Sequence, residues 1–473
     1  MMNSLTVALE RRIFLFAFPG VVIALSLLLL GAYAAMSGKA HVKQTAAGVA
    51  AFEQETNEAL DEWRAALVDI EATGEAPSPY AARPMNMRLP ASLPPAPLAD
   101  FAIGASDLLP TTTKLTGWAN PADLFIEYEF ANPTLLGAGG FDLTFLVVAL
   151  LPLVMIAASF DILAGERERG RLKIIAAQAG DVRASVWKRL LLRNGAIWAV
   201  FSLTALAALL IAPAPGLSGA RLAHFAAWLA VCWAYGAFWF SLIAFTVAFV
   251  RRSEAAAGAL FSLWAVFVFA VPAIGGAAAE ASHPPPSRLA FLSEMRQGEV
   301  EAVREAAQLT AGFLADHPEM TVSDENVPGF FRGAFLANQE AEKRTTPVVE
   351  AFAETRAQRK ALVGRLQFLS PALIANNALV AIAGGDVARN MAYQEQARAA
   401  LTELSERIGP AVVAKQRISL AEFDAIPEFA FQDRTLGRKL SSFAGPLGFL
   451  AVVAALLLIA AQRRLGASLE KLL

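Results

Sequence analysis

Residues 141–163 read FDLTFLVVALLPLVMIAASFDIL, a run in which Asp142 and Asp161 are the only charged side chains. A helix rises about 1.5 Å per residue, so roughly 20 apolar residues cross the ~30 Å hydrocarbon core of a bilayer. The run therefore predicts a transmembrane helix. Its two aspartates lie at the ends, where a carboxylate reaches water or caps the helix, so they do not indicate an ion path.

Runs of this kind recur along the chain. We predict six spans, at residues 13–35, 141–163, 194–212, 223–250, 255–275 and 443–461. The composition agrees, because 56% of the residues are hydrophobic and 17% are charged, against about 45–50% and 25% in soluble proteins. The first run exceeds the roughly 7–15 apolar residues of a secretory signal, which favours an uncleaved span over a cleaved signal peptide.

Basic residues orient the spans, because Lys and Arg accumulate in short cytoplasmic loops. They cluster before the first span, between the second and third, between the fourth and fifth, and after the sixth. We therefore expect both termini in the cytoplasm and two long segments, 36–140 and 276–440, outside. The predicted divisions are 1–35 (an interfacial helix and span one), 36–140, 141–163, 164–193 (cytoplasmic), 194–275 (spans three to five), 276–440 and 441–473 (span six and tail).

The two outer segments predict a mostly helical ectodomain. Apolar residues recur at helical spacing over 47–70, and seven prolines between Pro77 and Pro97 then predict an extended connector over the surface. The second segment predicts helices at about 288–315, 334–368, 385–408 and 419–425, with Gly384-Gly385 and Gly409-Pro410 as stop signals. No alternating pattern of any length indicates a sheet. The fold class is thus an all-α membrane protein.

Several kinds of chemistry find no support in the sequence. A formal charge of −2 does not favour a nucleic-acid partner, and Cys232 is the only cysteine. The four histidines are isolated, which disfavours a metal site. The chain has no GxSxG nucleophile elbow and no GxxxxGK[ST] phosphate loop. We therefore expect no cofactor and no enzymatic activity in this chain, and any energy from ATP has to arrive through another polypeptide.

The most informative cytoplasmic stretch is 161–178, which reads DILAGERERGRLKIIAAQ. It leaves the second span with alternating acids and bases and meets a glycine that is able to turn the chain. The simpler interpretation is a juxtamembrane helix whose charges hold the span in register. The alternative is a docking site for a cytoplasmic partner, because the stretch combines charged and apolar side chains compactly.

The residues Gly165-Glu166-Arg167-Glu168-Arg169-Gly170-x-Leu172 resemble the G-E-R-E-x-G-T-L signature of ABC-2 type transporter permeases, in letters and in position after a second span. Arg171 stands where Thr is usual, and Gly180 where a proline often follows. In that family the loop docks on a nucleotide-binding ATPase. The resemblance implies these ATPase-coupling residues: Gly165, Glu166, Arg167, Glu168, Arg169, Gly170, Leu172 and Ile175.

The outer segments extend the resemblance. Residues 93–98 (LPPAPL) with 104–110 (GASDLLP), and 369–372 (LSPA) with 383–389 (AGGDVAR), resemble a subgroup of these permeases with two large periplasmic insertions, classed as a domain of unknown function. This implies a multi-pass subunit of the bacterial inner membrane, in contact with its lipids. It would dimerise with itself or a sister permease, and a partner ATPase would hold the ATP and Mg²⁺.

The resemblance implies that the chain is the permease subunit of an ATP-driven exporter, energised by a separate ATPase that docks on residues 165–178. A second hypothesis is a machine that couples cytoplasmic ATP use to motion of the ectodomain without passing a substrate. A third is a membrane-anchored enzyme or receptor, against which stands the lack of a catalytic constellation.

Overall fold

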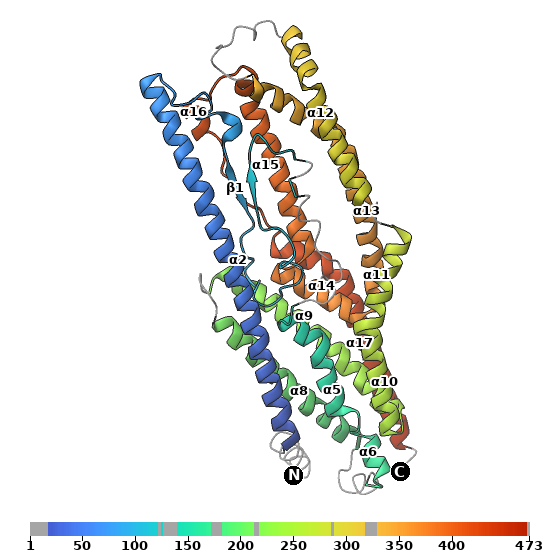
Figure 1. Ribbon diagram of the computed structural model, residues 1–473. Helices are drawn as coiled ribbons and strands as arrows, with labels where there is room; N and C mark the ends of the chain where they lie inside the picture. The colour runs from blue at the N-terminus through green and yellow to red at the C-terminus, as the bar shows by residue number, and fades with distance from the viewer. Residues whose placement is uncertain are drawn as a thin grey trace.

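The computed structural model describes residues 18–121, 124–125, 140–171, 182–211, 217–284, 288–316 and 329–470. The predicted interfacial helix before the first span, and the candidate residues Leu172 and Ile175, lie outside these ranges. The described chain is predominantly helical (Figure 1). Six helical stretches are long and apolar enough to cross a membrane, as predicted: Gly20–Thr73, Leu143–Glu168, Val182–Leu210, Gly219–Phe249, Ser253–Ser282 and Leu436–Gly466.

The apolar helices gather at one end of the molecule (Figure 1). Their elements are α2 (Phe18–Thr73), α4 (Leu143–Phe145), the π-helical η4 (Leu146–Leu150), α5 (Leu151–Ser159), α6 (Ala164–Glu168), α8 (Val182–Leu210), α9 (Gly219–Phe249), α10 (Ser253–Ala265), the π-helical η5 (Val266–Ala270), α11 (Val271–Ser282) and α17 (Leu436–Glu470). The start of α2, the end of α17 and α6 lie at the same end, which agrees with an even number of crossings.

The remaining elements form the middle and the opposite end of the molecule, with α14 (Pro371–Ala383) next to the apolar helices (Figure 1). They are η2 (Pro84–Asn86), β1 (Leu89–Ser92), β2 (Thr112–Leu115), α12 (Arg288–Asp316), α13 (Phe330–Leu366), η7 (Gln367–Leu369), α14 (Pro371–Ala383), α15 (Val387–Val413) and α16 (Leu420–Asp424). The strands pair antiparallel, with Leu89 opposite Leu115 and Ser92 opposite Thr112. Four-residue strands are too short to give an alternating pattern that stands out in sequence.

The first predicted span and the predicted helix at 47–70 are one continuous helix, α2. The sequence between them contains Gly38 and Gly48 but no proline, so nothing ends the helix. Close packing requires glycine at position 38, because a Cβ there would collide with the carbonyl oxygen of Asp100. One helix therefore runs without a break through the apolar bundle and beyond it.

The prediction of a surface connector for the proline-rich stretch was wrong for most of its length. Residues 74–80 are largely exposed, but Met85, Met87, Ala91 and Leu98 are fully buried. The first three belong to a core with α2, α13 and α15, and Leu98 belongs to the core of the apolar helices. Proline prevents a helix but not burial, because its ring is apolar and an extended chain can pack between helices.

The predicted helices of the second outer segment are present, with shifted ends. Gly384 stops α14 in the left-handed conformation at φ 90°, as a stop signal requires. Gly409-Pro410 was wrongly predicted to be a stop, since Pro410 lies inside α15, which continues to Val413. Helix α14 was not predicted. It is buried in the core formed by the apolar helices rather than in the second core, which contains Met85, Met87 and Ala91.

Candidate functional site

The predicted coupling residues Gly165 to Gly170 lie together in and just after α6, a short helix that follows the second apolar span. The Arg169 N–H donates to the Gly165 carbonyl at 3.1 Å, and Gly170 turns the chain at φ 67°. Only glycine adopts that backbone conformation without strain. The glycine thus marks the end of α6.

Glu166 of this element faces α8. Its carboxylate pairs with Arg171 at 2.9 Å and with Arg189 of α8 at 3.5 Å, and its side chain is only 16% exposed. One turn further along α8, Arg193 pairs with Asp161 at 3.6 Å and donates to the Ala158 carbonyl at 2.7 Å. Two arginines four residues apart therefore hold the end of the second span and α6 against α8.

Glu168 faces a different helix. Its carboxylate accepts hydrogen bonds from the Ser253 N–H at 2.8 Å and from the Ser253 hydroxyl at 2.5 Å, at the first residue of α10. Sequence reasoning identified both glutamates but not their partners Arg189 and Ser253, nor the pairing of Arg193 with Asp161. The four-residue spacing of the arginines was a usable signal. For Ser253, the only signal in the sequence was that a serine stands at the start of an apolar helix.

The charged side chains that remain exposed at this end are mainly basic. Arg169 and Arg171 are 58% and 50% exposed, and Arg251 and Arg252 are also exposed. Glu168 and Glu254 are exposed at this end as well, so these four guanidinium groups lie beside two exposed carboxylates.

The two π-helical segments are places where the spans are joined by side-chain hydrogen bonds. Pro152 has no N–H to donate back to the turn before it, and Tyr235 of α9 donates its hydroxyl to the Val148 carbonyl at 2.9 Å. Trp264 of α10 donates to the Ala149 carbonyl at 2.8 Å. At the second segment, Pro272 follows η5, and Ser370 donates its hydroxyl to the Phe267 carbonyl at 2.5 Å. The freed carbonyls are thus satisfied inside the apolar region.

Three of the four sequence stretches that carried the resemblance, 93–98, 104–110 and 383–389, converge in space. The Ala105 N–H donates to the Gly385 carbonyl at 3.0 Å, and Arg389 donates to the Pro94 carbonyl at 2.7 Å. Asp142 caps the second span as predicted, since one oxygen accepts from the Phe145 N–H at 2.7 Å and the other from the Ile103 N–H at 2.8 Å. Asp142 is buried, so the alternative of contact with water was wrong.

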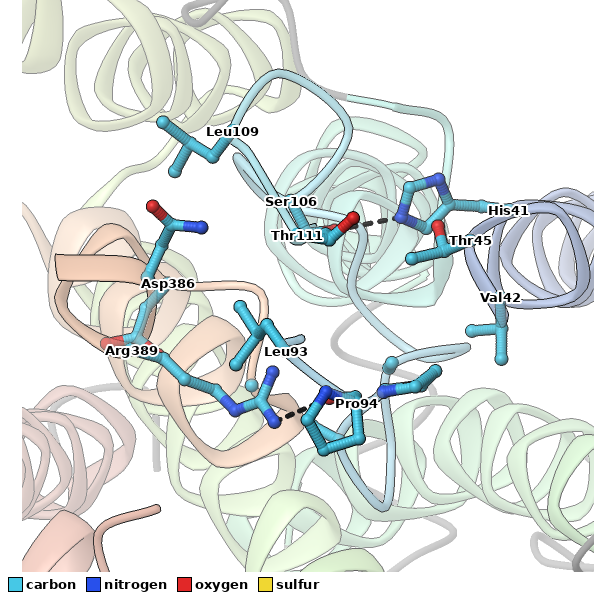
Figure 2. Close-up of a pocket in the computed structure, with 15 residues that line it drawn as sticks. His41, Val42, Thr45, Leu93, Pro94, Ser106, Leu109, Thr111, Asp386 and Arg389 are labelled. Carbon is cyan, nitrogen blue, oxygen red and sulfur yellow. Dashed lines mark hydrogen bonds between the residues drawn. The ribbon is translucent and has the colours of Figure 1, made fainter. Parts of the chain in front are cut away.

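We call the region where α2, the 93–111 stretch and the turn from α14 to α15 meet the outer junction. A hollow lies between these three parts (Figure 2). On one side His41 Nε2 and Ser106 Oγ are 2.9 Å apart, and on the other Arg389 reaches Pro94. The ammonium group of Lys439 and the guanidinium of Arg389 bind the Asp433 carboxylate at 3.2 and 2.9 Å. Within the described ranges, no group of three or more metal-ligating side chains gathers.

Comparison with known proteins identifies one part of the chain. Residues 288–432 match the family described as a domain of unknown function, DUF3526. The match runs from α12 to α16, the second of the two predicted outer segments. No curated protein matches the chain.

Proposed function

We propose that this chain is the permease subunit of an ATP-driven ABC exporter, energised by a separate ATPase that docks on residues 165–178. The observation that carries the proposal is α6, an element at one end of the apolar bundle whose two glutamates engage two different spans. A force applied to α6 would reach α8 through Glu166 and α10 through Glu168. The partner ATPase would supply the P-loop, ATP and Mg²⁺.

The proposal includes an arrangement in the bacterial inner membrane. Both termini and α6 lie in the cytoplasm, and the two long segments lie in the periplasm, in agreement with the basic residues at the α6 end. A second permease, identical or a sister subunit, completes the transporter, and lipids cover the exposed apolar faces. Cysteine accessibility tests the orientation: a cysteine at Arg169 should react with a membrane-impermeant thiol reagent only from inside, and one at Glu406 only from outside.

The decisive experiment reconstitutes the chain in proteoliposomes with a candidate P-loop ATPase from the same organism. We expect the two to co-purify, and we expect Glu166→Lys to uncouple ATP hydrolysis from transport while leaving membrane insertion intact. Glu406→Lys, on an exposed face of α15, is the matched control. If Glu166→Lys retains full activity and still co-purifies with the ATPase, the coupling role of α6 is wrong.

A second candidate function is an ATP-driven machine that moves its ectodomain without transporting a substrate. One observation favours it: α2 continues from the apolar bundle to the far end of the ectodomain without interruption. Transport in vesicles together with distance measurements between ectodomain helices separates the two functions. Nucleotide-dependent movement without flux of any tested cargo would support the second candidate over the first.

A further inference from the structure

Glu168 supplies the cap that α10 lacks in its own sequence. The residue before α10 is Arg252, whose side chain caps nothing. The first N–H groups of a helix need an acceptor, and a carboxylate is the strongest one available because it also meets the positive end of the helix dipole. The Glu168 carboxylate takes this place from another element, by accepting from both the N–H and the hydroxyl of Ser253.

Helix α10 leads directly to the ectodomain. It continues through η5 and α11, so one helical stretch runs from Ser253 to Ser282. Two contacts join this stretch to the second outer segment. The Phe267 carbonyl accepts from Ser370, which precedes α14, and the carbonyl of His283 accepts from Arg359 Nε of α13 at 2.6 Å.

We infer that Glu168 is the positioning residue that makes α6 and α10 move as one unit, and that α10 is the path by which movement of α6 reaches the ectodomain. This inference rests on the proposed function. Glu166 has a different task, because its partner Arg189 belongs to α8. Glu166 therefore connects α6 to α8, whereas Glu168 connects α6 to α10. The helical stretch that begins with α10 ends beside α13.

The first test measures the cap itself and needs no ATPase. In the full chain in nanodiscs, Glu168→Ala should speed amide hydrogen exchange in the first turn of α10 by roughly fivefold, as expected for a lost helix cap. Glu254→Ala removes the exposed carboxylate that belongs to the first turn of α10 itself, and it should speed exchange less than Glu168→Ala does. Equal exchange in the Glu168→Ala variant and the wild type would overturn the role of Glu168.

The second test replaces the cap by a removable covalent link. In a Cys232→Ala background, Glu168→Cys and Ser253→Cys are joined by a short bis-methanethiosulfonate reagent and released by a reductant. With the ATPase present, we expect the unlinked protein to lose most nucleotide-driven movement of α13, measured by spin-label distances, and the linked protein to regain it. Full movement without the link, or none with it, would overturn the inference.

Failure of the proposed function and failure of the inference about Glu168 give different results in these tests. If the wild-type chain binds no ATPase, the proposed function fails, and hydrogen exchange still reports on the cap. If the wild type binds the ATPase and α13 moves with nucleotide, but the link between residues 168 and 253 has no influence, only the inference about Glu168 fails.

Discussion

Arg221 at the start of α9 and Asp100 in the 93–111 stretch form a buried bidentate ion pair. The two guanidinium nitrogens lie 3.0 and 2.8 Å from the two carboxylate oxygens, and one of them also donates to the Pro97 carbonyl at 2.6 Å. The pair joins the outer junction to the apolar helices. Sequence reasoning placed Arg221 in a short outer loop and gave it no partner.

Removing one member of this pair should be costly, because the other charge stays buried without compensation. We expect Asp100→Ala to lower the free energy of unfolding by about 3–5 kcal/mol. Asp424→Ala is the control, since the Arg64–Asp424 pair is 42% and 50% exposed and should contribute no more than about 1 kcal/mol. Denaturant unfolding in detergent measures both. Similar losses for the two variants would contradict a special role of the buried pair.

The turn between α14 and α15 depends on glycine. A Cβ at Gly385 would lie 2.6 Å from the Ile103 carbonyl oxygen and 2.7 Å from that of Ala102. Gly385→Ala should therefore push the 93–111 stretch away and destabilise the protein by about 1–3 kcal/mol. Gly364→Ala in α13 meets nothing within 4 Å and should be neutral or stabilising by up to about 1 kcal/mol. Equal midpoints of thermal unfolding for Gly385→Ala and Gly364→Ala would contradict this prediction.

Close packing of α8 on α9 requires Gly236. A Cβ at this position would collide with the Trp198 ring, whereas one at Gly195 in α8 meets nothing within 4 Å. We expect Gly236→Ala to reduce stability by about 1–3 kcal/mol through overpacking, and Gly195→Ala to leave it unchanged or raised. Unfolding in mixed micelles measures the difference. A tolerated Gly236→Ala would mean that the two helices do not pack this closely.

Acid should weaken the outer junction through Asp433. Burial raises the pKa of this carboxyl, but Lys439 and Arg389 more than offset burial and bring its pKa below the ordinary value of 3.8. An acid with a depressed pKa contributes stability above its unfolded pKa and loses it as the pH falls through the folded pKa. Between pH 5 and pH 2 the wild type should therefore lose more stability than Asp433→Asn. Parallel pH profiles of the unfolding midpoint would contradict this prediction.

The apolar spans and most helices of the second outer segment were predictable, because apolar length and helical periodicity are properties of neighbouring residues. Helix α14 was not, since its 13 residues are too few to cross a bilayer and its burial depends on α9 and α17. The predicted helix end at Gly409-Pro410 was wrong for the same reason, because the packing of α15 outweighs a local stop signal. For the candidate site, the position of Gly165 to Gly170 after the second span was predictable. The partners Arg189 and Ser253 become neighbours only when the helices pack.

The length of α2 sets a distance. Its 56 residues correspond to about 84 Å, of which a bilayer's hydrocarbon core takes up roughly 30 Å. In the proposed membrane arrangement, the remaining ~54 Å hold the tip at Thr73 at a constant height above the lipid. Shortening or lengthening the helix by seven residues, about two turns, would shift that height by about 10 Å while turning the tip only slightly. Anything that meets the tip has to stand at that separation from the bilayer.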